Sequence, residues 1–585
     1  MSKMIKFTID GKNVEVKEGQ TILDGARKLG IDIPTLCFLK EINEVGACRM
    51  CLVEVEGARG LVTSCVYPAT EGMVVRTNTP EILKARKNTL ELILSNHNIS
   101  CLTCTRNGNC ELQILSKKFG LKDIRFHGEK TKAIRDDSSK CISRDTSKCI
   151  LCGKCISICD KVQTVSAITK VKRGFDTYVG VAGDMEISKS TCVGCGQCIA
   201  HCPVAALKEK DAISEVIDAI NDPKMHVVVQ TAPAIRAALG EEFGMEIGTL
   251  VTGKMVSALK QAGFDKVFDT DFAADVTIME EGTEFLERLN NEGVLPMITS
   301  CSSGWITFAE KFFPDVLQHL STTKSPMSIL GTLIKTKYAD NMNINPKDIY
   351  SVAIMPCSAK KAEMERDELK VDGKQMVDAV LTTRELARML KQLNIDLAHQ
   401  EDSEFDNPLG EATGAAHIFG VTGGVMEAAL RTINKQVTGK HIENIAFTKL
   451  RGVKGIKEAK VDVGGKEINI AVAQGLGNVR KLLEEVRDGK SKYQFIEVMT
   501  CPGGCIMGGG QPIRTAKERA TIDVAGLRAK ALYKADEKEL HRISCDNESV
   551  MNLYKEFLGK PNGEKAHKLL HTHYNKQEVY ERDVI

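Results

Sequence analysis

The chain has 585 residues, of which 43% are hydrophobic and 27% are charged, and its net charge is +2. This length predicts several domains, because a single core rarely grows past about 250 to 300 residues. The near-neutral charge gives no support for nucleic-acid binding. Because the sequence contains no apolar run of membrane-spanning length and no signal-type segment, we expect a cytoplasmic protein without a membrane span.

The cysteines are distributed unevenly along the chain. Sixteen of the 21 lie in the first 202 residues, and five lie in the remaining 383. In a large chain without export signals, this number favours metal binding over a disulfide scaffold. We therefore expect a multidomain protein with α+β and α/β parts, in which groups of cysteines hold metal centres.

Residues 1–79 are expected to form a small α+β domain. The segment IKFTIDGKNVEVK alternates polar and apolar residues around Asp10-Gly11, which predicts a β-hairpin, and TILDGARKLG predicts a helix that ends at Gly30. Four thiolates on long loops suit a 2Fe-2S cluster in a ferredoxin-like, β-grasp domain, with a zinc site as the alternative. The expected ligands are Cys37, Cys48, Cys51 and Cys65.

Residues 80–125 are expected to form a second cluster domain. A helical apolar pattern follows Pro80, which is suited to the first turn of a helix, and this helix delivers His97 near its end. The spacing HxxxCxxCxxxxxC predicts a 4Fe-4S cluster in which a neutral imidazole raises the reduction potential, with a Cys3His zinc site as the alternative. The expected ligands are His97, Cys101, Cys104 and Cys110.

Residues 139–209 contain the spacing CxxCxxCxxxC twice, which predicts a duplicated ferredoxin domain with two 4Fe-4S clusters. In such a domain the fourth cysteine of each run binds the other cluster, whereas zinc sites favour separated CxxC pairs. Asp160 follows the first run, in place of the usual proline, whereas Pro203 follows the second run. One cluster is expected on Cys149, Cys152, Cys155 and Cys202, and the other on Cys192, Cys195, Cys198 and Cys159.

Residues 210–545 are expected to form a large α/β domain, because apolar strands such as HVVVQ, LPMI, SVAIM and YQFIEVM alternate with helical stretches. Cys301, Cys357 and Cys501 each follow one of these strands, and Cys505 follows Cys501. Loops at the carboxyl ends of such strands converge on one crevice, so these thiols are expected to share a site. The glycines of CPGGCIMGGGQP let the backbone approach a bulky group closely, and the loop lacks a phosphate-binding signature.

Two cysteines have no partners in a pattern. Cys141 and Cys545 are expected to be structural, since free cysteine often behaves as a small buried hydrophobe. Residues 546–585 are expected to form a tail of helical segments broken at Gly559 to Gly563.

The segments TSCSSGW, MPCSAKKAE and EVMTCPGGCIMGGGQP resemble the three signature loops of iron-only (FeFe) hydrogenases, and the N-terminal cysteine sets resemble those of multi-cluster members. The resemblance covers nearly the whole chain, including a small-subunit-like tail. It implies an H-cluster, a 4Fe-4S cubane joined to a two-iron azadithiolate unit with CO and cyanide ligands. It also implies that Cys357, Cys501 and Cys505 bind the cubane and that Cys505 is the bridging thiolate.

The first loop departs from the family pattern, which has two adjacent cysteines followed by a proline. Here Cys301 takes the proton-relay position, Ser302 takes the position of a cubane ligand, and Ser303 replaces the proline. Serine is a poor iron ligand unless it is deprotonated. Two interpretations stand: Ser302 binds through oxygen while Cys301 relays protons, or a local shift brings Cys301 onto the cubane.

Further residues match the family by resemblance. Glu281, Glu284 and Arg288 lie on one helix face and, with Ser321, resemble the proton path to Cys301, although the charges alone would fit a solvated helix face. Lys360 resembles the donor to a cyanide ligand, and Met327 replaces a glutamine often present nearby. The residues expected to line the two-iron site are Ala232, Pro233, Met355, Phe419 and Met499.

The resemblance implies reversible conversion of protons and electrons into H2, with four accessory clusters relaying electrons. The chain has no dinucleotide or flavin motif, so it cannot exchange hydride with a nicotinamide by itself. We expect a hetero-oligomer, an NAD(P)-linked or electron-bifurcating complex in which a separate flavoprotein subunit binds NAD(P). A stand-alone ferredoxin-linked hydrogenase is the alternative. A degraded or H2-sensing hydrogenase is a weaker alternative. The relay subunit of respiratory NADH dehydrogenases also resembles the first 200 residues but lacks the three downstream cysteine loops.

Overall fold

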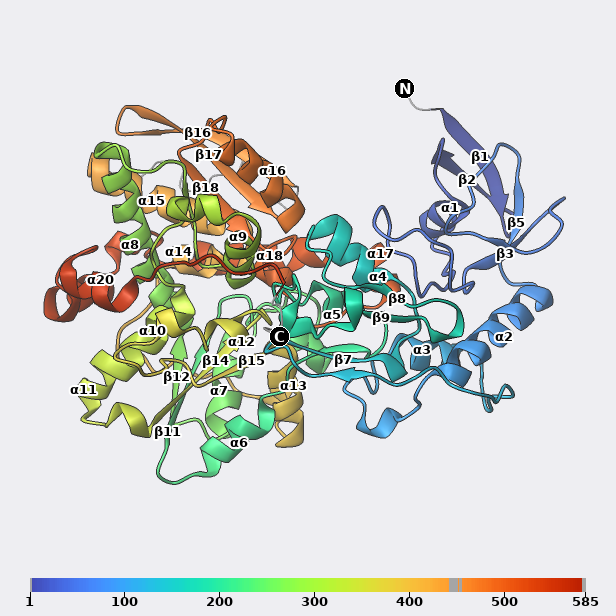
Figure 1. Ribbon diagram of the computed structural model, residues 1–585, viewed down its shortest axis with the longest axis horizontal. Helices are drawn as coiled ribbons and strands as arrows, with labels where there is room; N and C mark the ends of the chain where they lie inside the picture. Colours follow the sequence, from blue (N-terminus) through green and yellow to red (C-terminus); the bar gives the residue numbers. More distant parts are fainter. Residues whose placement is uncertain (1–2, 441–450, 452–454, 581–585) are drawn as a thin grey trace.

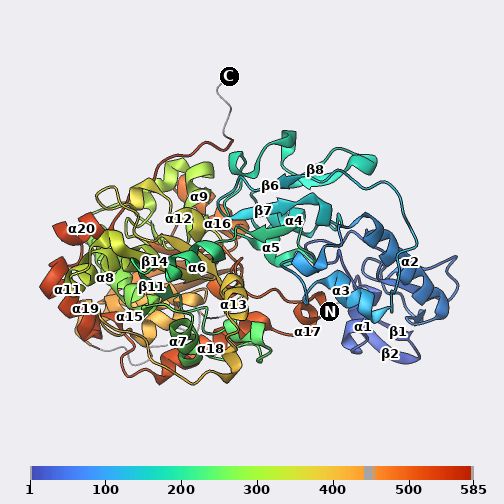
Figure 2. The same ribbon diagram turned by 90° about the horizontal axis from the view of Figure 1, so that it is seen from below.

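The computed structural model of the chain describes residues 3–440, 451 and 455–580. Three parts follow one another in space: an N-terminal part with two small units, a ferredoxin-like middle, and a large α/β domain at the opposite end (Figures 1 and 2). The multidomain fold with α+β and α/β parts that the sequence predicts is confirmed.

The N-terminal unit is a five-stranded mixed sheet in the order β2-β1-β5-β3-β4, with helix α1 packed against it. The predicted hairpin is present, and both of its turn residues, Asp10 and Gly11, have positive φ angles, as a tight hairpin turn requires. Thr21 caps α1 in a capping box with Asp24. The elements are β1 (Met4–Ile9), β2 (Lys12–Lys17), α1 (Ile22–Lys28), β3 (Leu52–Val55), β4 (Val62–Thr63) and β5 (Val74–Arg76).

The second unit begins with the predicted helix α2 (Pro80–Asn96). Thr79 caps this helix by accepting a hydrogen bond from the Ile82 N–H, Pro80 occupies its first turn, and the helix ends at His97. A single turn, η1 (Cys101–Thr103), and helix α3 (Glu111–Lys118) complete the unit.

The middle part contains the duplicated pattern. In each copy a glycine with positive φ, Gly153 or Gly196, precedes a short helix. The copies end differently, because Pro203 stops the second helix after His201, whereas Asp160 allows the first to continue as η3. The strands are β6 (Arg135–Asp136), β7 (Ile142–Asp145), β8 (Thr169–Val171), β9 (Tyr178–Gly180) and β10 (Leu207–Glu209), and the helices are η2 (Thr146–Lys148), α4 (Lys154–Ser157), η3 (Ile158–Val162), η4 (Gly174–Asp176), η5 (Ala182–Asp184), η6 (Ile187–Lys189) and α5 (Gln197–His201).

The large domain contains two four-stranded sheets. One is fully parallel, in the order β12-β11-β14-β15, and the other has the order β13-β18-β17-β16, with only β16 antiparallel to its neighbour. All four apolar segments singled out in the sequence are strands, and the cysteine loops leave from both sheets. The strands are β11 (His226–Thr231), β12 (Lys266–Asp269), β13 (Met297–Ile298), β14 (Ile349–Met355), β15 (Ala379–Thr382), β16 (Ile456–Val463), β17 (Lys466–Gln474) and β18 (Phe495–Met499).

Helices surround these two sheets, with α8 and α15 packed together and α8 also packed on α10 (Figure 1). The α-helices are α6 (Ile213–Asn221), α7 (Thr252–Gln261), α8 (Thr270–Asn290), α9 (Ser303–Phe312), α10 (Pro326–Leu333), α11 (Ala339–Met342), α12 (Lys360–Glu363), α13 (Thr383–Gln392), α14 (Gly414–His417), α15 (Gly424–Thr438) and α16 (Leu476–Arg487). The shorter turns are η7 (Leu239–Phe243), η8 (Pro314–His319), η9 (Ile334–Tyr338), η10 (Pro346–Asp348), η11 (Asp367–Leu369), η12 (Leu397–His399), η13 (Ile418–Gly420) and η15 (Cys505–Met507).

The C-terminal part holds the molecule together at two places. Helix α17 reaches back to the N-terminal part, where the Ala516 N–H donates to Glu111 at 2.6 Å (Figures 1 and 2). The predicted broken helical tail is present, and His571 binds the buried Glu280 at 3.0 Å. The elements are α17 (Ala516–Thr521), α18 (Val524–Lys538), η16 (Ser544–Asp546), α19 (Glu548–Leu553), η17 (Tyr554–Leu558) and α20 (Glu564–Leu570). Within the described residues, no helix combines the length and apolar character needed to cross a bilayer.

Candidate active site

The three cysteine loops of the large domain meet at one cavity of about 80 Å³. Cys301 and Ser302 follow β13, Cys357 follows β14, and Cys505 lies in the loop after β18. Cys501 is buried beside this cavity; burial raises the pKa of its thiol, and the Cys357 and Cys505 thiolates raise it further. The sequence-predicted residues that line the cavity are Ala232, Pro233, Cys301, Ser302, Met355, Cys357, Lys360, Phe419, Met499 and Cys505.

The thiols and the apolar walls of this cavity fit an iron-sulfur cluster that carries a further iron unit shielded from water. Four thiols separated by up to about two hundred positions in the sequence are brought together, and thiolates are the natural ligands of iron-sulfur clusters. Met355, Met499 and Phe419 are nearly fully buried, so the cavity walls exclude water. In the described part of the chain, no three His, Cys, Asp or Glu side chains converge tightly enough for a single metal ion.

The glycine-rich third loop packs on protein backbone. A Cβ atom on Gly508 would lie 2.2 Å from the Pro356 carbonyl oxygen, and one on Gly509 would lie 2.3 Å from the Cys195 carbonyl oxygen. The bulky group that these two glycines approach is therefore the second cysteine loop and the ferredoxin-like part. The same packing brings the Cys195 thiol within electrostatic range of Cys501.

Adjacent residues of the first loop face different neighbours. Burial raises the pKa of the Cys301 thiol, and the Glu281 carboxylate and the Cys505 thiolate raise it further. The Ser302 Oγ accepts a hydrogen bond from the Thr500 N–H at 3.2 Å and lies 2.7 Å from the Thr500 Oγ1. Cys301 is thus placed between Glu281 and Cys505, whereas Ser302 is bound to the loop that carries Cys501.

The predicted proton-path residues form a connected chain. The Arg288 guanidinium donates to Glu284 at 2.6 Å, and the Ser321 hydroxyl donates to the same carboxylate at 2.8 Å. Burial raises the pKa of Glu281 to about 8, and the nearby Glu284 charge adds to this shift. Ser300 donates to the Glu281 Oε1 only at 3.4 Å, and the Oε2 is buried without a hydrogen-bond partner among the described residues. The contacts run from a half-buried arginine through Glu284 and Ser321 to the buried Glu281 carboxyl, whose raised pKa a Ser321 hydrogen bond partly offsets.

Lys360 lies at the rim of the cavity, and its ammonium group is fully engaged. It donates to Glu363 at 2.7 Å, to the Ser325 hydroxyl at 2.7 Å and to the Cys301 carbonyl oxygen at 3.2 Å. Sequence reasoning missed Glu363, although it belongs to the segment MPCSAKKAE and follows Lys360 by three positions. That spacing on a helix was the only signal in the sequence for this ion pair.

In the ferredoxin-like part, the fourth cysteine of each run lies close to the cysteines of the other run. The charge of the Cys202 thiolate raises the pKa of the Cys149, Cys152 and Cys155 thiols, and the charge of the Cys192 thiolate raises that of Cys159. Burial raises the pKa of these thiols, so as bare thiolates they would be poorly stabilised, which fits their use as iron ligands. Cys149, Cys152, Cys155 and Cys202 all line one small cavity of about 20 Å³.

The N-terminal cysteine set is also gathered and adjoins the first of these clusters. The Cys51 and Cys65 sulfur atoms lie 3.3 Å apart, and Cys48 forms a hydrogen bond with Cys37. Asn43 donates to the Cys37 carbonyl oxygen at 2.6 Å and to the Cys152 carbonyl oxygen at 3.0 Å. One amide side chain therefore fixes the two cysteine loops against each other.

Among the described residues, His97 keeps one ring nitrogen uncommitted, as an iron ligand requires. Its Nδ1 is buried without a hydrogen-bond partner in the part of the chain that the structure describes. Burial lowers the pKa of His97, and a hydrogen bond with the Lys148 backbone opposes this shift. A neutral imidazole with one nitrogen uncommitted is the form that binds iron. Cys110 is buried, and Cys101 and Cys104 are partly exposed.

Comparisons with known proteins agree with this arrangement. Residues 225–509 match the family described as iron only hydrogenase large subunit, C-terminal domain. The chain is 49% identical to the NADP-reducing hydrogenase subunit HndD of Solidesulfovibrio fructosivorans, over 98% of this chain and 99% of that protein. The chain belongs to the iron-only hydrogenase family. This hydrogenase is also 42% identical to iron hydrogenase 1 of Clostridium pasteurianum, over 98% of this chain and 100% of that protein.

A solved structure shows the same catalytic fold. A variant of the FeFe-hydrogenase HydA1 from Chlamydomonas reinhardtii superposes with a TM-score of 0.57 at 39% identity, over 63% of this chain and 100% of that one. The remaining parts of this hydrogenase match iron-sulfur families, which leaves the zinc alternatives without support. They are a 2Fe-2S iron-sulfur cluster binding domain (2–80), an NADH-ubiquinone oxidoreductase-G iron-sulfur binding region (86–125), a 4Fe-4S dicluster domain (148–206) and an iron hydrogenase small subunit (522–577).

Proposed function

We propose that this iron-only hydrogenase is the hydrogen-converting subunit of an NAD(P)-linked complex and that it is cytoplasmic. The observation that carries the proposal is its similarity, over nearly the whole of both chains, to a subunit of an NADP-reducing hydrogenase. The chain itself shows no nucleotide-binding fingerprint, so a partner flavoprotein subunit has to supply that chemistry. The substrates are H2 and protons, and the assembly is a hetero-oligomer.

The H-cluster, when bound, supplies the reversible combination of two protons and two electrons into H2. In this proposal Cys357, Cys501 and Cys505 hold the cubane, and the apolar residues of the cavity keep water away from the two-iron unit. Cys301 moves the proton between the cavity and Glu281, because its thiol lies under the influence of both Glu281 and Cys505. Ser302 occupies the fourth ligand position through its oxygen.

Glu281, Ser321, Glu284 and Arg288 carry protons between Cys301 and the surface in this proposal. Glu281 is suited to this task because a carboxyl with a pKa of about 8 both holds and releases a proton near neutral pH. Its Oε2, which has no hydrogen-bond partner among the residues that the structure describes, leaves one oxygen free to carry that proton. The Arg288 guanidinium, held by Glu284 and by the Leu320 carbonyl oxygen at 2.8 Å, fixes the outer end of the path.

Four accessory clusters complete the proposal: one 2Fe-2S cluster and three 4Fe-4S clusters. The contacts support a branched order, in which the 2Fe-2S set meets the cubane at Cys152, the second cubane follows, and Cys195 adjoins Cys501 of the H-cluster. The His97 set joins near Cys202, since Arg106 donates to the Cys202 carbonyl oxygen at 3.0 Å. The proposed domains are 1–79, 80–125, 139–209, 210–545 and 546–585.

The two outer clusters present different surfaces to partners. Beside the His97 set, Leu102 is 94% exposed, and residues 97–133 contain seven lysines and arginines against three acidic residues. Residues 1–79 contain ten of each sign, and Val45, near Cys48, is 57% exposed. This difference supports an acidic, ferredoxin-type carrier at the His97 set and the flavoprotein subunit at the 2Fe-2S domain.

Co-purification tests the proposal. The chain is expected to copurify with a flavoprotein, and the complex is expected to couple H2 oxidation to NAD(P) reduction. Turnover with viologen dyes but without any bound flavoprotein would favour the second candidate, a stand-alone ferredoxin-linked hydrogenase, which the basic surface at the His97 set supports. Separate Ser302→Ala and Cys301→Ala variants, examined by cubane spectra and turnover, test the first loop. Loss of the cubane only in the Cys301 variant would reject the relay role.

A further inference from the structure

The Lys360 ammonium has no freedom left at the active-site cavity. A lysine ammonium has three hydrogens, and in this site Glu363, Ser325 and the Cys301 carbonyl oxygen accept one each. A long side chain held in this way has lost its usual rotational freedom, so the charge stays at one point on the cavity wall. The partner that fixes it electrostatically is Glu363.

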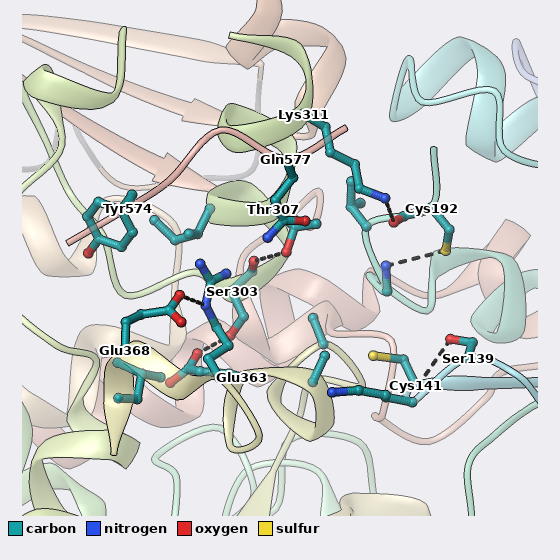
Figure 3. Close-up of a pocket in the computed structure, with 18 of the residues that line it drawn as sticks. Ser139, Cys141, Cys192, Ser303, Thr307, Lys311, Glu363, Glu368, Tyr574 and Gln577 are labelled. Atoms are coloured by element: carbon teal, nitrogen blue, oxygen red, sulfur yellow. Dashed lines mark hydrogen bonds and ion pairs between the residues drawn. The ribbon is translucent and has the colours of Figure 1, made fainter. Parts of the chain in front are cut away.

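Glu363 approaches Lys360 from outside the active-site cavity. It lines a second, larger cavity of about 460 Å³ between the ferredoxin-like part, the large domain and the tail (Figure 3). Besides Lys360, the Glu363 carboxylate accepts hydrogen bonds from Ser325 at 2.5 Å, from Ser328 at 2.9 Å and from Ser303. These four donors satisfy both carboxylate oxygens and come from three different helix starts.

The helix starts add to the field at Glu363. Ser303 is the first residue of α9, and Ser325 is the N-cap residue of α10, so two helix N-termini point their partial positive charge at this carboxylate. Burial by itself would raise the pKa of Glu363, but the Lys360 ammonium and the serine hydrogen bonds hold it below its ordinary value. These contacts favour the charged carboxylate form of Glu363.

Two adjacent serines connect the first loop to the other two loops. Ser302 binds Thr500, next to Cys501 in the third loop, and Ser303 binds Glu363, which follows Cys357 in the second loop. Figure 3 shows the Ser303 and Glu363 side chains pointing toward each other. Cys301 lies in the chain between β13 and these two serines, and its carbonyl oxygen accepts the third hydrogen bond of Lys360.

From this geometry we propose that Glu363 is a positioning residue: it fixes the Lys360 ammonium at the active-site cavity and, through Ser303, fixes the first loop that carries Cys301. The inference rests on the role that the family resemblance implies for Lys360, a fixed positive charge beside a cyanide ligand of the two-iron unit. Without the carboxylate, Lys360 keeps only neutral acceptors, and a cavity of about 460 Å³ lies open beside it. The ammonium then moves away from the cavity wall.

The test compares Glu363→Gln with Glu310→Gln in the complete, cluster-loaded enzyme. Glu310 is the matched control, because it is also buried, lies on α9 and forms its ion pair with Arg366 rather than with Lys360. We expect Glu363→Gln to shift the infrared bands of the cyanide ligands and to lower turnover by about tenfold to a hundredfold, the usual effect of a misplaced active-site group. Electron paramagnetic resonance spectra of the accessory clusters should remain unchanged in both variants.

A rescue experiment separates positioning from general damage. In Glu363→Ala the missing carboxylate borders the larger cavity, so added formate should restore part of the turnover and return the cyanide bands toward their original positions. Formate should have no effect on Glu310→Ala. Ser303→Ala, which removes one donor only, should cause a smaller shift in the same direction and serves if Glu363→Gln does not fold.

The inference is overturned if the cyanide bands of Glu363→Gln and Ser303→Ala match those of the unmodified enzyme, or if Glu310→Gln shifts them equally. A band shift without any response to formate in Glu363→Ala would also count against it. Viologen-linked H2 turnover of the unmodified enzyme is measured in parallel. If the unmodified enzyme shows no H2 turnover, the proposed function is refuted. If it does show turnover, a negative result in the variants refutes only the positioning role of Glu363.

Discussion

Replacing Glu281 with glutamine isolates the proton-carrying step of this hydrogenase. The glutamine keeps the size and the neutral charge of a protonated carboxyl but cannot exchange a proton. The Glu281 carboxyl is fully buried, and its pKa is raised to about 8 by burial and then by Glu284. At pH 7 such a group is about nine-tenths protonated, so Glu281→Gln closely imitates the resting state and should fold and bind clusters normally.

Turnover should nevertheless fall, because the path has lost the group that passes the proton on to Cys301. Positioned acid-base groups contribute about 10² to 10⁴ in rate, which corresponds to roughly 3 to 5 kcal/mol of barrier. The assay is H2 evolution with reduced methyl viologen, normalised to iron content and to the accessory-cluster signals. A variant with matched clusters that keeps more than about half of the original turnover would refute this assignment.

The pH profile provides a second readout of the same residue. A raised carboxyl pKa means that Glu281 is a neutral proton donor below about pH 8 and an ionised group above it. Between pH 7 and pH 9 its protonated fraction falls from about nine-tenths to about one-tenth. H2 evolution by the unmodified enzyme should therefore decline across this interval, and the residual activity of Glu281→Gln should lack that decline.

Three further substitutions test separate parts of the structure. His97→Cys replaces a neutral ligand with a thiolate and should lower the potential of that cluster by roughly 100 mV, and an unchanged potential in a redox titration would show that His97 is not a ligand. Ser302→Cys should change the spectrum of the H-cluster cubane while keeping turnover, and an unaltered spectrum would place residue 302 outside the cubane. Gly509→Ala forces a Cβ against the Cys195 carbonyl and should cost about 1 to 3 kcal/mol, seen as a lower Tm, whereas Gly60→Ala, with no atom within 4 Å, should leave the Tm unchanged.

The parts of this hydrogenase that were predictable from sequence are those with local spacing rules. The hairpin at Asp10-Gly11 and the helix after Pro80 depend on neighbouring residues only, and the structure contains both. Likewise, the repeated cysteine spacing predicts that Cys202 lies beside the first run, and in the structure its thiolate is close enough to raise the pKa of Cys149.

Long-range contacts were not predictable in this way. The close packing of Gly509 on Cys195 joins positions 314 residues apart, and no sequence pattern indicates which surface the glycines meet. The Ser303 and Glu363 contact depends on how two sheets bring their loops together, whereas the sequence reasoning considered a single crevice. The role of Asn43 between two cysteine loops was hidden for the same reason, because a lone asparagine in a loop has no diagnostic pattern.

The direct packing of Gly509 on the Cys195 backbone limits how the enzyme can be re-engineered. A ferredoxin-like domain taken from another protein would have to present exposed backbone at the position of Cys195. A side chain at Gly509 would hold the ferredoxin-like part and the large domain apart. The rate of electron tunnelling falls steeply with the distance between clusters. A chimaera in which the ferredoxin-like part lies slightly farther from the large domain would therefore assemble but deliver electrons slowly. Domain exchange is therefore most promising when the ferredoxin-like part and the large domain are kept together and only the N-terminal units are replaced.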